Sequence, residues 1–287
     1  MPNKKNYILT MICPDASGIS ANVLNFIYEN KGFITSSFNY GDPTTKKYFM
    51  RTVFQGADSK FKNLEDIRTK FTPIAEKYSM QWEIDDYSHR PRVLIAVSKF
   101  GHCLNDLLHK TKSGQIPMEI VAVVSNHTEM KDLVEWHGIN YFHLPSTPDN
   151  KAENEEKILQ LVDGLKIDLV VLARYMQILS PKMCKALNGR CINIHHSFLP
   201  SFKGAAPYTQ AHDRGVKIVG ATAHYVTPNL DEGPIIEQAV ERVDHTYTTD
   251  DIAMTVRDLE TIILSRAVKW HVERRILLNG TKTVVFR

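Results

Sequence analysis

Hydrophobic positions in the first part of the chain recur with two periods, one typical of strands and one typical of helices. Apolar residues three or four positions apart, from Ile19 to Ile27, predict a first helix. A second helix contains Pro73, which we expect to kink or split it. Apolar runs predict four strands, at Tyr7–Ile12, Phe33–Tyr40, Tyr48–Gln55 and Gln81–Asp85. The resulting order βαββαβ is that of a ferredoxin-like sandwich.

The hydrophobic pattern changes after a polar linker, Asp85–Pro91, and we place a domain boundary between residues 86 and 87. Beyond it, strands that are apolar on both faces alternate with helices, which predicts a mostly parallel sheet of an α/β domain. The predicted strands are Arg92–Ser98, Glu119–Val124, Asp168–Ala173, Cys191–His195 and Val216–Val226, with a last strand at Thr283–Phe286. The predicted helices are Cys103–Lys112, Met130–Trp136, Asn150–Gly164, a helix that begins at Pro181, and Thr249–Leu277. Residues 87–287 thus form a Rossmann-like domain, with ligands expected beyond the carboxyl ends of its strands.

The amino-acid composition and net charge limit the classes of protein to which this chain can belong. The 287 residues are 43% hydrophobic and 23% charged, which is usual for a globular protein of one or two domains. A net charge of +3 without a long basic block predicts no nucleic-acid partner, and no apolar run approaches membrane-spanning length. The N-terminus lacks the apolar core of a signal peptide, and four cysteines without CxxC spacing indicate reduced thiols. We therefore expect a cytoplasmic protein that does not bind membranes.

One stretch, Asn188–Gln238, contains the side chains best suited to acyl chemistry. Asn193 and His195 stand two apart at the end of a predicted strand, so their side chains point to the same side. Asp231 follows in a tight turn, Leu230–Pro234. An amide N–H can stabilise an oxyanion, an imidazole can donate a proton, and a carboxylate can hold that imidazole charged or take a proton from water. These three residues are the predicted catalytic set.

The motifs of this stretch resemble the folate-dependent formyltransferase family. The resemblance runs from about Pro91 to the C-terminus and is carried by Asn-Ile-His at 193–195, Ser-Phe-Leu-Pro at 197–200, Gly-Ala-Thr-Ala-His-Tyr-Val at 220–226 and Leu-Asp-Glu-Gly-Pro-Ile-Ile at 230–236. The doublet of His195 and His196, where the transferases usually carry His-Pro, is similar to the hydrolytic branch of the family. The resemblance implies hydrolysis of 10-formyltetrahydrofolate to tetrahydrofolate and formate, which supplies formate for purine synthesis, without a cofactor. It assigns the same catalytic roles to Asn193, His195 and Asp231.

The resemblance also implies a folate-binding loop. Met176, Gln177, Ile178 and Leu179 match a family loop that holds the pterin through backbone groups and apolar side chains. Ordinary core packing is the alternative for the three apolar residues. A transferase often has arginine in place of Gln177, so the contact of Gln177 with the folate is left open.

The loop after the first strand of the second domain bears on the choice between hydrolysis and transfer. The alternative function is transfer of the formyl group to an amine such as glycinamide ribonucleotide, whose transferase holds the acceptor phosphate in a Gly/Ser/Asn-rich loop. Here the loop is Ser98–Cys103, and its bulky Phe100 and His102 make a poor phosphate site. We expect Phe100 and Gly101 to border the acceptor side of the cleft, and His196 to position a water.

Other interpretations of the polar residues stay open. His196, His224 and Asp231 would suffice, with the catalytic histidine, to bind zinc, but they lack helical ligand spacing and we expect no metal. Lys203 and Tyr208 either line the cleft or are a solvated lysine and a packed tyrosine. A third interpretation is an amino-acid sensor without catalysis, which the presence of the catalytic set disfavours.

The N-terminal domain carries a resemblance of its own. The stretch Cys13–Ile19, which opens the first helix, looks like an ACT domain. The resemblance implies a homo-oligomer, either a dimer or a tetramer, and an amino-acid effector such as glycine or methionine held near Asp15 and Gly18. The alternative is a structural role, in which Asp15 caps the helix and Gly18 permits close packing.

Overall fold

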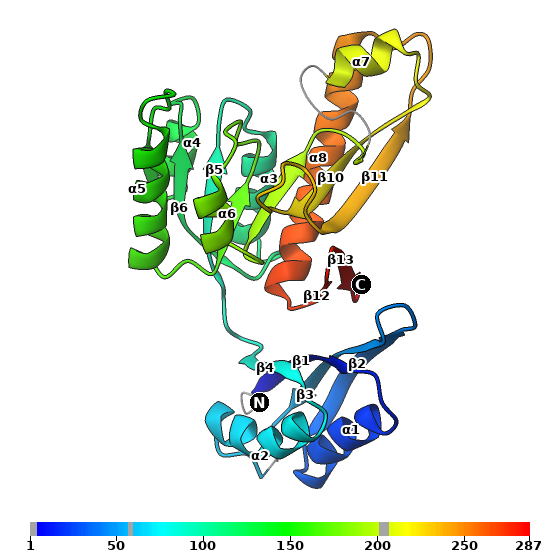
Figure 1. Cartoon of the computed structure of the whole chain (residues 1–287). Coiled ribbons are helices and arrows are strands. Elements are labelled where there is room, and N and C mark those ends of the chain that lie inside the picture. Colours follow the sequence, from blue (N-terminus) through cyan, green and yellow to red (C-terminus); the bar gives the residue numbers. More distant parts are fainter. Residues whose placement is uncertain (1–4, 57–59, 201–206) are drawn as a thin grey trace. The chain divides into compact units, whose positions relative to one another are not determined.

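The computed structural model describes residues 5–56, 60–200 and 207–287, which form two compact units (Figure 1). The first unit comprises Met1–His89 together with Arg274–Asn279 and Val284–Arg287. The second comprises Arg90–Glu273 and Gly280–Thr283. The chain therefore leaves the first unit at His89 and returns to it after Glu273.

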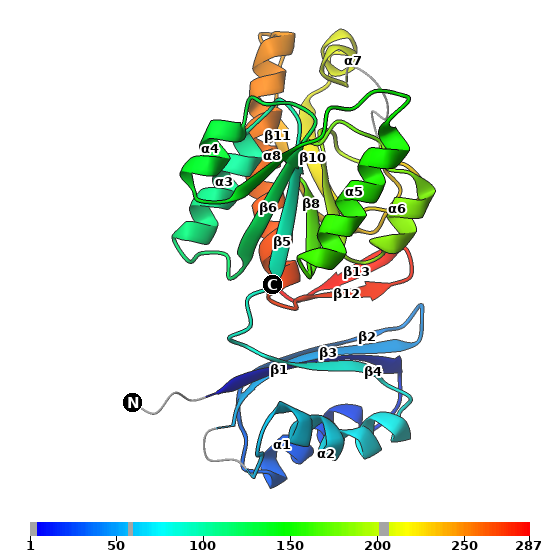
Figure 2. The ribbon, with the colours of Figure 1, turned by 90° about the vertical axis from the view of Figure 1, so that its left-hand side faces the viewer.

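The first unit is a four-stranded antiparallel sheet with two helices on one face (Figure 2). Its strand order is β2-β3-β1-β4. In chain order its elements are β1 (Asn6–Pro14), α1 (Ile19–Glu29), β2 (Phe33–Asp42), β3 (Lys47–Gln55), α2 (Leu64–Lys77) and β4 (Gln81–Asp86). The predicted βαββαβ order is confirmed, and the topology is the ferredoxin-like one.

Alternate residues of β1 form the centre of this unit's core, because successive strand side chains point to opposite faces. Leu9 and Met11 are buried and belong to one apolar cluster with Ile27 of α1 and Phe71 of α2. Helix α2 runs through Pro73 without a break, so the predicted split does not occur. An interior proline costs a helix about 3 kcal/mol, and the burial of Phe71 and its neighbours on the same helix face offsets that cost.

The end of the chain differs from the prediction. Helix α8 (Thr249–Val272) stops before the predicted Leu277, because Arg274 adopts a left-handed conformation with φ of 55°. The apolar residues beyond that point continue the helical pattern in sequence, but they form β12 (Ile276–Asn279). It pairs with β13 (Lys282–Val285), which confirms the predicted last strand.

Buried polar contacts attach this C-terminal segment to the first unit. Arg51 Nε donates a hydrogen bond to the carbonyl oxygen of Arg274 (3.1 Å). Asn279 Nδ2 donates to Asp42 Oδ2 (2.6 Å). Arg51 and Asp42 are both buried, so each gains a partner that water would otherwise supply.

The second unit is built on a seven-stranded sheet in the order β11-β10-β9-β8-β5-β6-β7. Neighbours from β9 to β7 pair in parallel, whereas β10 pairs antiparallel with both β9 and β11. The strands are β5 (Arg92–Val97), β6 (Glu119–Ser125), β7 (Asn140–His143), β8 (Leu169–Leu172), β9 (Cys191–His195), β10 (Ile218–Tyr225) and β11 (Ile235–Arg242). The predicted α/β fold with a mostly parallel sheet is confirmed.

Helices cover both faces of this sheet, as Figure 2 shows. Helices α5 (Lys151–Gly164) and α6 (Pro181–Ala186) lie on one face, and α3 (His102–Lys112), α4 (Lys131–Trp136) and α8 lie on the other. The central strand β8 is accordingly buried along its whole length. Among the helices in the described ranges, none combines the length and apolar character needed to cross a membrane.

Three elements of the second unit are absent from the sequence prediction. Strands β7 and β11 lie at the two edges of the sheet and are only partly buried, so neither has a long apolar run. Helix α7 (Pro207–Asp213) lies where we predicted the end of a loop.

The carboxyl ends of β8 and β9 lie next to each other in the middle of the sheet, where Leu172 pairs with Asn193. The segment after β8 and the end of β9 therefore reach the same edge of the sheet, as predicted. In a parallel sheet this edge is where ligands bind.

Candidate active site

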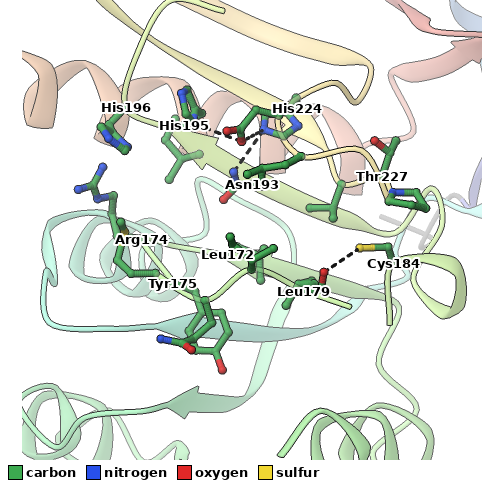
Figure 3. Close-up of a pocket in the computed structure, with 18 residues that line it drawn as sticks. Leu172, Arg174, Tyr175, Leu179, Cys184, Asn193, His195, His196, His224 and Thr227 are labelled. Carbon is green, nitrogen blue, oxygen red and sulfur yellow. Dashed lines mark hydrogen bonds and ion pairs between the residues drawn. The ribbon is translucent and has the colours of Figure 1, made fainter. Parts of the chain in front are cut away.

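A cavity of about 430 Å³ opens at the carboxyl edge of the large sheet. Residues within 172–179, 193–196 and 224–231 line it, together with Cys184 of α6 (Figure 3). The three predicted catalytic residues and the predicted pterin loop therefore border one space.

Strand β10 holds Asn193 in place. Asn193 lies opposite His224, and its Nδ2 is 3.2 Å from His224 Nε2. His224 Nδ1 is 2.9 Å from the carbonyl oxygen of Tyr225, so Nδ1 carries the proton. Burial lowers the pKa of His224, which keeps the ring neutral and its Nε2 an acceptor. Asn193 therefore donates one amide N–H to His224 and keeps the other for a ligand.

Asp231 lies in the turn between β10 and β11, in a left-handed conformation with φ of 56°. This turn packs closely on β10, because a side chain at Gly233 would overlap the carbonyl oxygen of Tyr225. Asp231 Oδ1 is 3.3 Å from His195 Nδ1 and 3.8 Å from His224 Nε2. Burial acts to raise the pKa of Asp231, but the hydrogen bond and charge of His195 outweigh it and lower the pKa. The carboxylate thus stays ionised and stabilises a charged imidazole.

The two ring nitrogens of His195 have different surroundings. The residue is buried, and its Nδ1 faces Asp231. Its Nε2 has no hydrogen-bond partner among the residues that the structure describes. Leaving a buried polar atom unpaired costs about 1–3 kcal/mol. An imidazole in this arrangement is ready to exchange a proton with a ligand atom that reaches Nε2.

His196 lines the same cavity. Its ring centroid lies 5.0 Å from that of His195 and 5.6 Å from that of Tyr208 in α7. Burial, followed by the charge of Arg174, lowers the pKa of His196 to about 4. The ring is therefore neutral at neutral pH and acts as a hydrogen-bonding group, and its contact with a water stays a prediction.

The predicted pterin loop presents apolar side chains to solvent. Met176 and Ile178 are 54% and 60% exposed, so the alternative that they are ordinary core residues is wrong. Leu179 is partly buried and packs against the core. Gln177 Oε1 accepts a hydrogen bond from Ser146 Oγ (2.9 Å). A flat aromatic ligand would cover the exposed apolar groups.

The loop after β5 has a different position. Neither Phe100 nor Gly101 is among the described residues that line the cavity, and their contact with a substrate stays a prediction. Phe100 stacks on the guanidinium of Arg174, which does line it, with 5.6 Å between Cζ and the ring centroid. Gly101 allows close approach to Met130, whose sulfur would overlap a side chain at that position.

Sequence reasoning missed a buried ion pair beside the cavity. Arg174 and Glu260 of α8 are 6% and 0% exposed, and Nη1 and Oε1 are 2.5 Å apart. An arginine inside the apolar run Leu-Val-Val-Leu-Ala-Arg-Tyr-Met is the signal that could have revealed the pair. Glu260, His102 and Cys103 are close enough to share a metal ion, but Arg174 already neutralises the carboxylate.

The remaining predicted residues lie elsewhere. Lys203 is outside the residues that the structure describes. Asp15 and Gly18 are exposed at the start of α1. Gly18 is the N-cap, with φ of 85°, and no side chain caps the helix, so the alternative in which Asp15 caps it is wrong. The effector role of these two residues stays a prediction.

Known proteins share this fold and sequence. The model of the formyl transferase family matches residues 91–268. The formyltetrahydrofolate deformylase of Corynebacterium sp. (strain P-1) is 47% identical over 100% of both chains. A crystal structure of formyltetrahydrofolate deformylase from Burkholderia mallei ATCC 23344 has a TM-score of 0.93 and 48% identity, covering 99% of this chain and 100% of that one. Glycinamide ribonucleotide transformylase 1 from Symbiobacterium toebii has a TM-score of 0.64 and 30% identity, covering 70% of this chain and 97% of that one. Because similarity to the deformylases extends over both units, the chain belongs to the formyl transferase family and, within it, to the formyltetrahydrofolate deformylases.

Proposed function

We propose that the protein is a hydrolase that converts 10-formyltetrahydrofolate to tetrahydrofolate and formate, without a cofactor. The observation that carries this conclusion is the unpartnered Nε2 of His195, a residue that lines the cavity and whose Nδ1 lies 3.3 Å from Asp231. Asn193 adds an amide N–H at the same edge of the sheet. Hydrolysis of a formamide needs these groups: an oxyanion donor, a proton donor and an anion that stabilises its charge.

In this mechanism water attacks the formyl carbon while the free N–H of Asn193 binds the formyl oxygen, on which negative charge develops. A carboxylate with a lowered pKa is a weak base, so the main task of Asp231 is to orient His195 and hold it charged. His195 Nε2 then donates a proton to N10 of the folate as the C–N bond breaks. Asp231 also lines the cavity in which the folate is bound.

The apolar loop holds the pterin in this proposal. Met176 and Ile178 lose exposed apolar surface when the ring binds, and backbone groups from Gln177 to Leu179 provide its hydrogen bonds. A cavity of about 430 Å³ is within the range of sites that enclose ligands of this size. The formate released in the cytoplasm is available for purine synthesis.

Transfer of the formyl group to an amine has weaker support. The transformylase from Symbiobacterium toebii covers 70% of this chain, at 30% identity, whereas the deformylases cover nearly all of it. The loop after β5 carries Phe100 and His102, and His102 Nε2 is engaged at 2.6 Å by the buried Glu260. A loop with these bulky side chains, one of them already held by Glu260, makes a poor phosphate site.

The two functions are separated by one assay. The protein is supplied with 10-formyltetrahydrofolate, with and without glycinamide ribonucleotide, and both tetrahydrofolate and formate are measured. Hydrolysis predicts equal amounts of the two products and no effect of the amine. Formate that is absent without the amine, together with formylated amine on its addition, would contradict the hydrolase.

The proposal extends to the first unit. We infer that residues 1–86 act as an ACT-like domain that assembles a homo-oligomer, a dimer or a tetramer, and binds glycine or methionine near Asp15 and Gly18. Its ferredoxin-like topology and the exposed start of α1 support this role. Sedimentation measures the assembly, and titration with the two amino acids measures the response in activity. We expect Asp15→Ala to abolish the response and leave basal turnover unchanged, and an unaltered protein that ignores both amino acids would contradict the effector role.

A further inference from the structure

Arg174 is a buried cation at the cavity that the hydrolysis described above leaves without a task. It follows β8 directly, has a left-handed φ of 63°, and lines the cavity. Glu260 Oε1 lies 2.5 Å from Arg174 Nη1, and Glu260 Oε2 lies 2.6 Å from His102 Nε2. Both carboxylate oxygens are thus engaged, which fixes the guanidinium. Burying such charges costs several kcal/mol per ion, so stability alone is a poor explanation for the pair.

Several buried polar atoms near Arg174 lack partners among the described residues. They are Arg174 Nε, the Tyr208 hydroxyl and His195 Nε2. The Tyr208 hydroxyl nevertheless lies close enough to Arg174 for that side chain to act against the rise in the pKa of Tyr208. The ring of His196 is in contact with the rings of both His195 and Tyr208. Figure 3 shows the guanidinium of Arg174 pointing toward His196. Buried polar atoms are normally satisfied, so a group of unpaired ones at one place indicates a ligand or an ordered water.

A second, smaller cavity provides space for such a ligand. It measures about 30 Å³, and both His196 and Tyr208 line it. His196 also lines the large cavity, which Arg174 lines as well, so His196 borders both spaces. A space of this size accommodates a water or an ion as small as formate.

The protonation states of Tyr208, His196 and the guanidinium determine which ligands they can bind. Burial, followed by the charge of Glu260, raises the pKa of Tyr208 to about 12, so its hydroxyl stays a donor. The pKa of His196 is lowered to about 4, so its ring is neutral. The guanidinium supplies a further N–H donor and a positive charge. Such a set suits a carboxylate or a water that becomes hydroxide, and it repels an ammonium ion.

We propose that Arg174, His196 and Tyr208 form a subsite that holds the attacking water and then the formate product. Glu260 and His102 are positioning residues, because Glu260 binds the guanidinium and His102 binds the second oxygen of that carboxylate. The inference rests on the proposed hydrolysis and deepens it, because it assigns a place to the acceptor and to the leaving carboxylate.

The reaction balances without a further reactant. The water oxygen bonds to the formyl carbon, and the bond from that carbon to N10 breaks. One water proton is transferred through the acid–base groups to N10, and the other is released to solvent. Formate is left as an anion, and its charge is stabilised by Arg174 Nε and the Tyr208 hydroxyl.

Product inhibition by formate tests the subsite in the intact protein. Arg174→Gly removes the guanidinium at a position whose conformation glycine adopts readily. We expect a fall in kcat of about 10²–10³-fold, a change in the folate KM below about threefold, and loss of the inhibition by formate. Added guanidinium ion should restore part of the activity. Arg257→Gln is the matched control, because Arg257 also stacks on Phe100 (4.9 Å) yet is not among the described residues that line either cavity.

Tyr208→Phe provides a second test that removes only a hydroxyl group. Formate should inhibit this variant about tenfold more weakly than the unaltered protein, and this result decides the matter if Arg174→Gly does not fold. Unchanged inhibition in Tyr208→Phe and in folded Arg174→Gly, or an unaltered protein that formate does not inhibit, would overturn the subsite while the hydrolysis stands. An unaltered protein that releases no formate from 10-formyltetrahydrofolate would overturn both proposals.

Discussion

The two ends of the large cavity are built in opposite ways. At the end formed by β9 and the turn after β10, His195 is buried and its Nδ1 lies 3.3 Å from Asp231, while Asn193 is held by His224. At the other end, the loop after β8 leaves more than half of Met176 and of Ile178 exposed. One end is polar, with Asn193 and His195 each held by a neighbouring side chain, and the other is apolar and open to water.

This difference indicates two tasks: the polar end stabilises charge during the reaction, and the apolar end binds the ligand. Groups that stabilise developing charge work best when they are in place before the reaction, because reorganisation would reduce the stabilisation that they give. Apolar groups that bind a ligand gain about 25 cal/mol per Å² of surface removed from water, so prior exposure favours binding. Changes at the polar end should therefore lower kcat, and changes at the apolar end should raise KM.

The largest effect is expected for Asp231→Asn. The amide cannot hold His195 charged, so kcat should fall by about 10²–10⁴-fold while folate binding and the melting temperature are retained. His212 and Asp213 provide a matched control, because the same two atoms are again 3.3 Å apart but both side chains are exposed. Steady-state kinetics of Asp231→Asn and Asp213→Asn check this, and near-normal turnover in folded Asp231→Asn would remove Asp231 from the catalytic set.

A second effect concerns stability in acid. The pKa of His196 lies near 4 in the folded protein and near 6.5 in the unfolded chain, so the unfolded state binds more protons between these values. The contribution of His196 to the free energy of unfolding is fully present above pH 6.5. It falls as the pH drops toward 4, by up to about 3 kcal/mol. Denaturant unfolding at pH 7.5 and pH 5 should show a smaller loss in His196→Gln than in the unaltered protein. His212→Gln, at an exposed position, should not reduce the loss, and equal losses in all three proteins would contradict a buried neutral His196.

A smaller effect is expected at His224, which acts through Asn193. His224→Phe keeps a ring but removes the nitrogen that accepts the Asn193 N–H, so the amide loses its fixed orientation. One such hydrogen bond corresponds to a fall in kcat of about tenfold, with little change in KM. Asn193→Ala alone and the double variant complete the comparison. If His224 works by positioning Asn193, the second substitution adds no further loss to Asn193→Ala, whereas independent losses would indicate a purely structural role.

The two ends also differ in how far the sequence predicts them. The spacing of Asn193 and His195 reflects the period of a strand, and apolar runs mark β8 and β9, so the catalytic edge could be located without coordinates. The ion pair between Arg174 and Glu260 could not be predicted from the sequence. It joins residues 86 positions apart, and a glutamate in a helix usually faces solvent.

Strands at the edge of the sheet were not predicted either, because the local sequence carries too weak a pattern. Strand β11 has exposed residues at its outer end, so its sequence lacks the apolar run that marks a buried strand. The register that places His224 opposite Asn193 depends on the pairing of β9 with β10, which no local pattern in either strand specifies.

The apolar end gives the smallest expected effect. Met176 lies at the cavity with 54% of its surface exposed, and Met254 of α8 is 63% exposed at a position that is not among the described cavity residues. Met176→Ala removes apolar surface that the pterin would cover, which corresponds to about 1 kcal/mol, or a rise in KM of about fivefold. The same contact is present before and during the reaction, so kcat should be unchanged. Met254→Ala should alter neither constant, which separates the loss of a ligand contact from a general effect of methionine removal. A fall in kcat in Met176→Ala with KM unchanged would show that the apolar end also shapes the transition state, and the division of tasks between the two ends would then be wrong.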